Sequence, residues 1–160
     1  MVFYNYQEIK TILLLFKSDL SEENNFIKSI IKKIEADGKK VSACGFLDKK
    51  ETQSLLFPEY IILTKADVSF LGKPKNKIIE NLLDKQYDVV IDLSLESIIP
   101  LSYLLIEAKS LFRVGRKRKE QGLIDFSIDI ATKKDNHTAI DEKYLFEQII
   151  FYLKNIQSHN

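Results

Sequence analysis

The sequence predicts an α/β domain: a mostly parallel β-sheet of five to six strands with helices on both faces. Short apolar runs, typical of strands buried on both sides, alternate along the chain with segments in which apolar residues recur every three or four positions, as in amphipathic helices. The chain has 160 residues, of which 45% are hydrophobic and 29% are charged. These values are typical of one globular domain. We therefore expect residues 1–160 to form a single domain, with an N-terminal extension over residues 1–9 and a closing helix over residues 141–157.

The first strand is predicted over residues 10–16, an almost continuous apolar run. A helix should follow, with Ser21 as its N-cap and with Glu22 and Glu23 in the first turn, where the helix dipole favours acidic side chains. Gly38 stands where a glycine commonly follows the end of a helix. The apolar stripe of this helix has helical spacing and comprises Phe26, Ile27, Ile30, Ile31 and Ile34.

The same alternation continues to the C-terminus. Pro100 is compatible with a helix that begins near Ser97, because a proline in the first turn removes no helical hydrogen bond. Asp141 is the expected N-cap of the closing helix. Further strands are predicted over residues 40–47, 60–64, 87–93, 112–115 and 123–130, and further helices over residues 51–57, 75–86, 97–109 and 141–156.

Strands that alternate with helices of this length imply right-handed βαβ units and a doubly wound, three-layer sheet of the Rossmann-like kind. Counting the six predicted strands from the N-terminus, we expect the order 3-2-1-4-5, with strand six (residues 123–130) at an edge. Only residues 116–122 join strands five and six, fewer than the dozen that a helical crossover needs. Strand six is therefore either parallel or antiparallel to its neighbour.

Ligands of an open parallel sheet bind beyond the carboxyl ends of the strands, where the strand order reverses. In the predicted order this crevice lies between strands one and four. The loop of residues 17–21 also leads into a helix N-terminus, which can hold an anion, but it lacks the glycines of a dinucleotide fingerprint or a P-loop. A capped helix with a solvated loop is the favoured interpretation there. The candidate ligand-binding residues of the crevice and its neighbouring loops are Lys17, Ser18, Asp19, Asp92, Ser94, Glu96 and Arg116.

Asp92 ends the apolar run of residues 89–92, a position where α/β enzymes often keep a catalytic or ribose-binding acid. The competing interpretation, which we favour, is that its carboxylate accepts hydrogen bonds from the backbone of the following turn.

Residues 113–119 hold five cations, which makes them a candidate docking site for a phosphate-rich ligand or a nucleic acid. No exposed aromatic set adjoins them to stack on bases, and the formal net charge of the chain is only +1. A solvated turn is the favoured interpretation, and nucleic acid is not expected as a partner.

Several kinds of chemistry lack the residues that they need. Cys44 is the single cysteine, and neither His137 nor His159 stands near the crevice, so we expect no metal site and no nucleophilic triad. No cofactor is expected. The chain has no apolar run long enough to span a membrane and no signal peptide, so we expect no membrane partner and a cytoplasmic location.

Aromatic residues near both ends of the chain favour a homodimer contact. They lie in the N-terminal segment Val2–Tyr6 and in the closing helix, at Phe146, Phe151 and Tyr152. An equally weighted alternative is that the N-terminal segment packs over the closing helix of its own chain.

Over nearly its full length the chain resembles a family of small bacterial proteins classed as a domain of unknown function. The start of the first strand, the segment Phe70–Pro74, residues 90–96 and the helix after them carry this resemblance. Residues 87–115 are also similar to the acceptor-side half of heptosyltransferase-like glycosyltransferases. In both, a strand that ends in Asp-Leu is followed by a helix, Ala-Lys and a strand that ends in Gly.

The glycosyltransferases carry Gly-Asp after their first strand, where this chain has Ser18-Asp19, so the second resemblance implies a shared fold rather than shared chemistry. The sequence as a whole favours a non-enzymatic or degenerate Rossmann-like domain that acts through a partner or through self-association. The alternative is a domain that binds a phosphorylated or sugar-nucleotide ligand at the carboxyl edge of the sheet.

Overall fold

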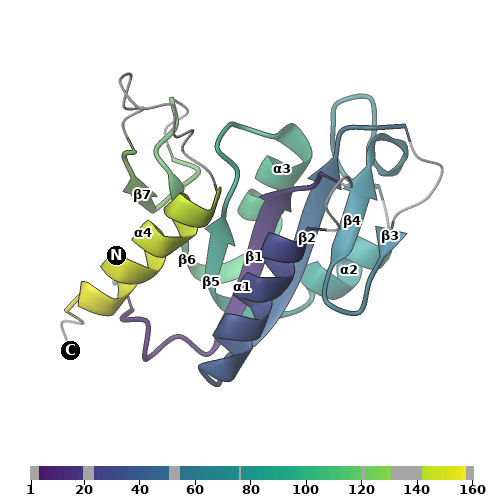
Figure 1. The fold of residues 1–160 in the computed structure, drawn as a ribbon. Helices are drawn as coiled ribbons and strands as arrows, with labels where there is room; N and C mark the ends of the chain where they lie inside the picture. The colour runs from purple at the N-terminus through teal and green to yellow at the C-terminus, as the bar shows by residue number, and fades with distance from the viewer. Residues whose placement is uncertain are drawn as a thin grey trace.

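The computed structural model describes residues 4–19, 24–50, 55–75, 77–119, 122–130 and 142–157. One seven-stranded sheet forms its centre, with the strand order β3-β4-β2-β1-β5-β6-β7 (Figure 1). β3 pairs with β4 antiparallel, and the other neighbouring strands are parallel. The strands are β1 (Thr11–Lys17), β2 (Lys40–Leu47), β3 (Leu55–Leu56), β4 (Ile61–Thr64), β5 (Gln86–Asp92), β6 (Lys109–Arg116) and β7 (Phe126–Ile128).

The predicted order of the six expected strands is confirmed, and β1 occupies the middle of the sheet because its side chains are apolar on both faces. Leu15 of β1 pairs with Cys44 of β2 on one side and with Asp92 of β5 on the other. The five residues from Ile12 to Phe16 are fully buried. A strand with this composition is stable only where helices cover it from both sides.

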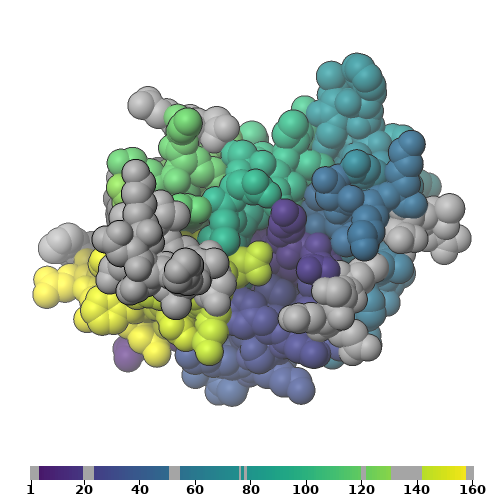
Figure 2. Space-filling view, turned by 45° about the horizontal axis from the view of Figure 1, so that its top comes forward, coloured from purple at the N-terminus to yellow at the C-terminus, as the bar shows by residue number. Residues whose placement is uncertain are grey.

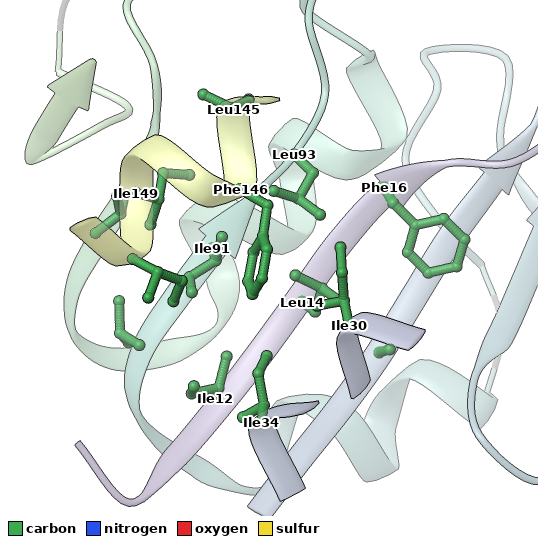
Figure 3. Close-up of a cluster of buried hydrophobic side chains, with 14 of the residues drawn as sticks. Ile12, Leu14, Phe16, Ile30, Ile34, Ile91, Leu93, Leu145, Phe146 and Ile149 are labelled. Atoms are coloured by element: carbon green, nitrogen blue, oxygen red, sulfur yellow. The ribbon is translucent and has the colours of Figure 1, made fainter. Parts of the chain in front are cut away.

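Helices lie on both faces of the sheet (Figure 1). α1 (Asn25–Ala36) and α4 (Glu142–Asn155) share one hydrophobic cluster with the sheet, while α2 (Lys77–Leu83) and α3 (Ile99–Glu107) share the other. Side chains of β1 alternate between the two clusters: Leu14 faces α1 and α4 (Figure 3), and Leu15 faces α2 and α3. No described helix is long and apolar enough to cross a membrane.

Helix ends follow local sequence signals in two of the places where we expect them. Gly38 has a positive φ of 82° and follows the C-cap of α1, Asp37, as the glycine at that position predicts. Pro100 lies in the first turn of α3. Ser21, however, is not the N-cap of α1, which begins at Asn25 after Asn24. Residues 20–23 and Asp141 lie outside the described residues.

The helix predicted over residues 51–57 is wrong at its end. Leu55 and Leu56 form the edge strand β3, which pairs with Ile61 and Ile62. A tight turn joins the two strands, closed by the N–H of Phe57, which donates to the carbonyl of Tyr60 at 3.0 Å. Pro58 cannot continue a helix, which is why the predicted helix ended before it. Its fixed φ suits the second position of this turn, where it favours the hairpin of β3 and β4. The sheet consequently has seven strands rather than five or six.

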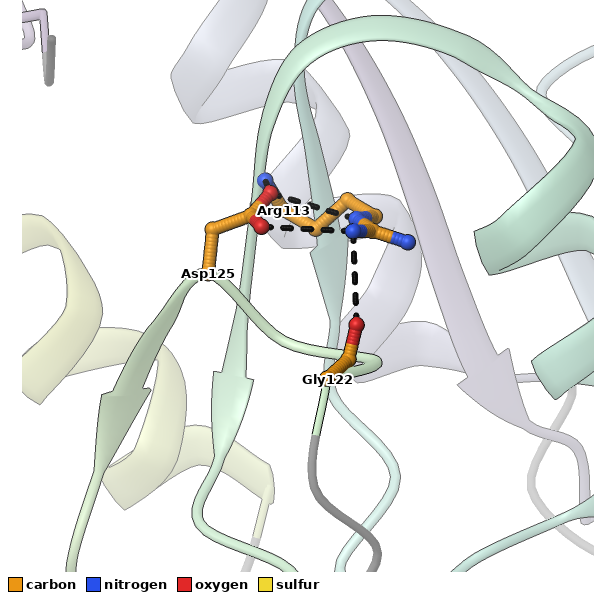
Figure 4. Close-up of polar contacts among 3 residues, drawn as sticks. All are labelled: Arg113, Gly122 and Asp125. Carbon is orange, nitrogen blue, oxygen red and sulfur yellow. Dashed lines mark hydrogen bonds and ion pairs between the residues drawn. The ribbon is translucent and has the colours of Figure 1, made fainter. Parts of the chain in front are cut away.

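The sixth predicted strand is shorter than expected, and its direction is parallel. β7 pairs only with the last three residues of β6, from Val114 to Arg116. The connection therefore has to travel back over only a few residues of strand, about 10 Å at 3.3 Å per residue, and needs no helix. Asp125 fixes this return: its carboxylate accepts hydrogen bonds from the backbone N–H and the guanidinium of Arg113 at 2.8–3.2 Å (Figure 4).

The described part of the N-terminal segment packs on α4 of its own chain. Asn5 donates through its side chain to the carbonyls of Lys154 and Ile156, and the N–H of Tyr6 donates to the carbonyl of Leu153 at 3.0 Å. The Tyr6 ring is buried. Residues 4–6 therefore pack over the closing helix of their own chain, as the second of the two alternatives predicts. Val2 and Phe3 lie outside the described residues.

Candidate functional site

The carboxyl edge of the sheet opens between β1 and β5, because the chain leaves β1 toward α1 on one face and leaves β5 toward α3 on the other. Figure 2 looks obliquely onto this edge, where the end of β1, the segment after β5 and the start of α4 lie next to each other. All seven candidate residues belong to this edge. They do not form one cluster but three: an exposed ion pair, a turn after β1 and a buried group between β5 and β6.

Lys17 and Glu96 form the exposed ion pair. Their side chains meet at 3.1 Å across the crevice, with exposed fractions of 52% and 68%. A pair this exposed contributes little to stability. Lys17 also borders two open pockets, one of about 510 Å³ toward α1 and one of about 330 Å³ toward α3.

Ser18 and Asp19, which follow β1, contact the side chain of Asn24, whose backbone is left-handed (φ 49°). The Asn24 side-chain amide donates to Oγ of Ser18 at 3.0 Å, and its carbonyl oxygen accepts the N–H of Asp19 at 3.3 Å. Asparagine tolerates this conformation when its side chain bonds locally. Three carboxylates and two lysines line the pocket beside these residues, so its charge does not favour an anionic ligand: Asp19, Asp48, Glu142, Lys17 and Lys49.

Asp92 is fully buried at the carboxyl end of β5. Its Oδ1 accepts the N–H of Ser94 at 2.9 Å, as the favoured interpretation of this residue predicts. Its Oδ2 accepts a hydrogen bond from Nη2 of Arg118 at 2.6 Å, and the Arg118 side chain is only 5% exposed. Gly115 lets the end of β6 lie close to the end of β5, because a Cβ at that position would lie 3.0 Å from Cδ1 of Ile124 and 3.2 Å from the backbone carbonyl oxygen of Asp92. Asp92 is thus held in a buried ion pair and is not a free general base.

Arg118 and Ser94 carry hydrogen-bonding groups that no described residue satisfies. Nε and Nη1 of Arg118 and Oγ of Ser94 are buried without a partner in the described part of the chain. Buried polar atoms are nearly always paired in native proteins, so three such atoms around one carboxylate require an explanation.

Arg116 adds a second guanidinium to this edge. Its Nη1 donates to the carbonyl of Leu95 at 3.0 Å, and its Nη2 donates to that of Ile130 at 3.3 Å. No described carboxylate lies within ion-pair distance of it. Arg116 and Arg118 thus bring two positive charges to the loop after β5, where Asp92 supplies one negative charge and Glu96 a second that is paired with Lys17. We call Asp92, Ser94, Arg116 and Arg118 the edge cluster.

The basic run of residues 113–119 is therefore not one solvated turn. Its three arginines turn inward: Arg113 onto Asp125, Arg116 onto backbone carbonyls and Arg118 onto Asp92. The lysines Lys117 and Lys119 are exposed, as a solvated turn predicts. Docking of a nucleic acid needs accessible cations, and most of the charge of this run is engaged inside the protein.

Sequence reasoning placed Arg116 at the edge but missed Arg118. The sequence held two partial signals for it, the glycine at position 115 beside the end of β5 and the short return to β7, which carries residues 117–119 over the sheet edge.

The model of a family of unknown function, DUF6913, matches residues 2–156 of the chain. The chain belongs to this family. No curated protein and no solved structure matches the chain. The resemblance to an uncharacterised domain family is thus confirmed, while the local similarity to glycosyltransferases stays a prediction.

Among the described residues, the one remaining thiol nucleophile, Cys44, does not join the edge cluster. Cys44 is fully buried in β2, and burial raises the pKa of its thiol from 9.0 to about 12, as befits a structural cysteine. The described residues contain no group of three or more His, Cys, Asp or Glu that could hold a metal ion. His137 and His159 lie outside the described residues.

Proposed function

We propose that this chain is a non-enzymatic, Rossmann-like binding domain of three layers that holds a small anionic ligand at the carboxyl edge of its sheet. One observation carries the proposal: the buried guanidinium of Arg118 and the hydroxyl of Ser94 keep hydrogen-bonding groups without a partner in the described part of the chain. They lie beside β5, at the point where α/β sheets bind ligands.

Hydrogen-bond energetics support a ligand at this position. A buried donor without an acceptor costs about 1–3 kcal/mol, which an acceptor oxygen recovers. Nε and Nη1 lie on different edges of the planar guanidinium, so one oxygen atom cannot accept from both. A ligand with several acceptor oxygens, such as a phosphorylated sugar or a nucleotide, matches these donors and the hydroxyl of Ser94.

Local charge supports the same sign of ligand. Arg116 and Arg118 outnumber Asp92, and the low dielectric of a buried site strengthens the attraction of the surplus positive charge for an anion. Because Asp92 is engaged by Arg118, we assign it a positioning role and propose no chemical step.

A buried, isolated thiol at Cys44 is compatible with the reducing cytoplasm, where we place the protein.

A thermal-shift screen with inorganic phosphate, nucleotides and sugar phosphates tests the proposal. A ligand at 100 times its Kd stabilises the fold by about 2.7 kcal/mol. Ser94→Ala should leave the unliganded protein as stable as before or slightly more stable, since it removes an unpaired hydroxyl, yet it should reduce the shift caused by the ligand. Ser110→Ala, at the opposite end of β6, is the matched control. No stabilisation by any of these compounds at millimolar concentration refutes the proposal.

Self-association is a second candidate, favoured by two sets of exposed apolar side chains. One set lies on α4 and comprises Tyr144, Phe151 and Tyr152; the other lies around α3 and comprises Phe70, Leu71, Ile99 and Ile106. Exposed apolar groups of this size commonly mark protein contacts. Light scattering tests this candidate, and a strict monomer at high protein concentration excludes it.

A further inference from the structure

We propose that the outer face of α3, together with the adjacent tip formed by Phe70 and Leu71, binds the same face of a second copy of this chain. This inference rests on the proposed self-association and states which surface makes the contact. It does not depend on the edge cluster.

α3 carries two apolar stripes where a surface helix normally carries one. Its inner stripe, which includes Leu101, Leu104 and Leu105, is buried against the sheet. On its outer side Ile99, Tyr103 and Ile106 follow at spacings of four and three, the spacing of a seam between packed helices. Ile99 and Ile106 are 60% and 55% exposed. Such a seam fits another helix, and in a two-fold dimer that helix is α3 of the second copy.

The tip extends this apolar face. Phe70 is fully exposed and Leu71 is 71% exposed. The backbone at Gly72 lies close to α3, because a Cβ at this position would stand 2.7 Å from Cγ2 of Ile99. The φ of Gly72 is +83°. Both observations require glycine at this position, so the close approach that places Phe70 beside α3 is built into the sequence.

The charge of the face suits a copy of itself. Among residues 69–73 and 99–107, Lys73 and Glu107 are the charged residues, and they meet at 3.6 Å. A face whose two charges have opposite signs and pair with each other does not repel its own copy, and interface centres are generally poor in charge and rich in aromatics.

The size of the face is also adequate. A fully exposed phenylalanine presents roughly 200 Å² of surface. Phe70 alone therefore supplies about a quarter of the ~800 Å² that each partner buries in a standard interface. Leu71, Ile99 and Ile106, each more than half exposed, add to it.

The aromatic side chains of α4 fit a second copy less well. Their rings are already in contact within the chain. The ring centroids of Phe151 and Tyr152 are 5.5 Å apart, and those of Tyr152 and Phe126 of β7 are 6.3 Å apart. Charged residues are interspersed among them along the helix, at Glu142, Lys143, Glu147 and Lys154. The α4 face consequently serves as the matched control.

Sedimentation equilibrium of the full chain tests the proposal with two variants. We expect a dimer for the wild type, and Ile106→Lys should weaken it roughly a hundredfold or more, because each copy would bury an unpaired ammonium in the interface. Phe151→Glu on α4 should leave the dissociation constant unchanged. Circular dichroism confirms that both variants fold, which is expected because both side chains are exposed.

A crosslinking experiment gives an independent measurement. Ser102 is half-buried on α3, one turn from both Ile99 and Ile106, so a cysteine at this position stands beside the proposed contact; the native Cys44 is buried and does not compete for the reagent. A short bismaleimide should join two Ser102→Cys chains but not two Glu147→Cys chains. A monomeric wild type refutes self-association altogether. A dimer that withstands Ile106→Lys, or that Phe151→Glu dissociates, refutes the α3 surface alone.

Discussion

Removing one partner of the Asp92–Arg118 pair should destabilise the fold far more than removing both. Asp92→Asn keeps the volume and the acceptor for the Ser94 N–H but leaves the Arg118 guanidinium buried without a counter-charge. Arg118→Met conversely leaves the Asp92 carboxylate buried without a counter-charge. Breaking a buried pair on one side costs about 3–5 kcal/mol, whereas replacing both charges is often neutral or stabilising.

The exposed fractions of the two side chains set this magnitude. They are 0% for Asp92 and 5% for Arg118, so solvent does not screen either charge. We expect each single variant to lower the midpoint of thermal unfolding by roughly 6–20 °C, and the double variant to lie close to the wild type. The coupling free energy should be at least about 3 kcal/mol.

Urea unfolding of the wild type, both single variants and the double variant measures this coupling by linear extrapolation. The matched control is the same cycle on Lys17 and Glu96, with both residues changed to Gln. These side chains are more than half exposed, so their coupling should be about 0.2–1 kcal/mol. If the Asp92 and Arg118 effects simply add, the two groups are not coupled as a buried pair, and the geometry of the edge cluster is wrong.

Three further predictions concern Cys44, Gly115 and Arg113. The pKa of the Cys44 thiol is about 12 in the folded state and 9.0 in the unfolded state, so above pH 9 only the unfolded state loses this proton. The free energy of unfolding should therefore fall above pH 9, by about 1.4 kcal/mol per pH unit more than in Cys44→Val. Equal slopes of the two proteins in urea unfolding at several pH values would contradict this. Gly115→Ala should cost about 1–3 kcal/mol in thermal unfolding, since its methyl group would press on the Asp92 carbonyl and on Ile124, and an unchanged midpoint would show that the edge has room. Arg113→Gln removes the guanidinium bonds to the Asp125 carboxylate and keeps only the bond from the Arg113 N–H, so it should accelerate hydrogen exchange of the β7 amides while leaving β1 protected. Equal rates before and after the change would mean that the backbone bonds alone hold β7.

Much of the sheet could be predicted because its signals are local. The apolar run of β1 requires cover on both faces, and the alternation of strands with helices fixes most of the connections. The prediction was wrong at β3 and left the direction of β7 open, because in both places a few residues decide the outcome. β3 has only two residues in strand conformation and follows a segment whose composition suits a helix, and β7 is parallel only because it pairs with no more than the end of β6.

The candidate site was less predictable because its decisive contact is long-range. Sequence reasoning identified Asp92, Ser94 and Arg116 from their places after β5 and β6. It saw Arg118 only as one cation among five, since no local pattern tells which arginine of a basic run folds back onto a carboxylate 26 residues earlier in the chain. The hydrogen bond from the Ser94 N–H to Asp92 is local, and it was predicted correctly.

Titration of the isotope-labelled protein, observed through the arginine Nε–H signals in NMR spectra, tests the anion proposal most directly. Arg118→Lys assigns the Arg118 signal, and Arg113, whose Nε already donates to Asp125, provides the internal control. Inorganic phosphate, a nucleotide and a sugar phosphate are added in turn. The proposal predicts that at least one of them shifts the Arg118 signal to saturation while the Arg113 signal stays in place. An Arg118 signal that none of the three moves, or that drifts together with that of Arg113, contradicts a ligand site at this edge.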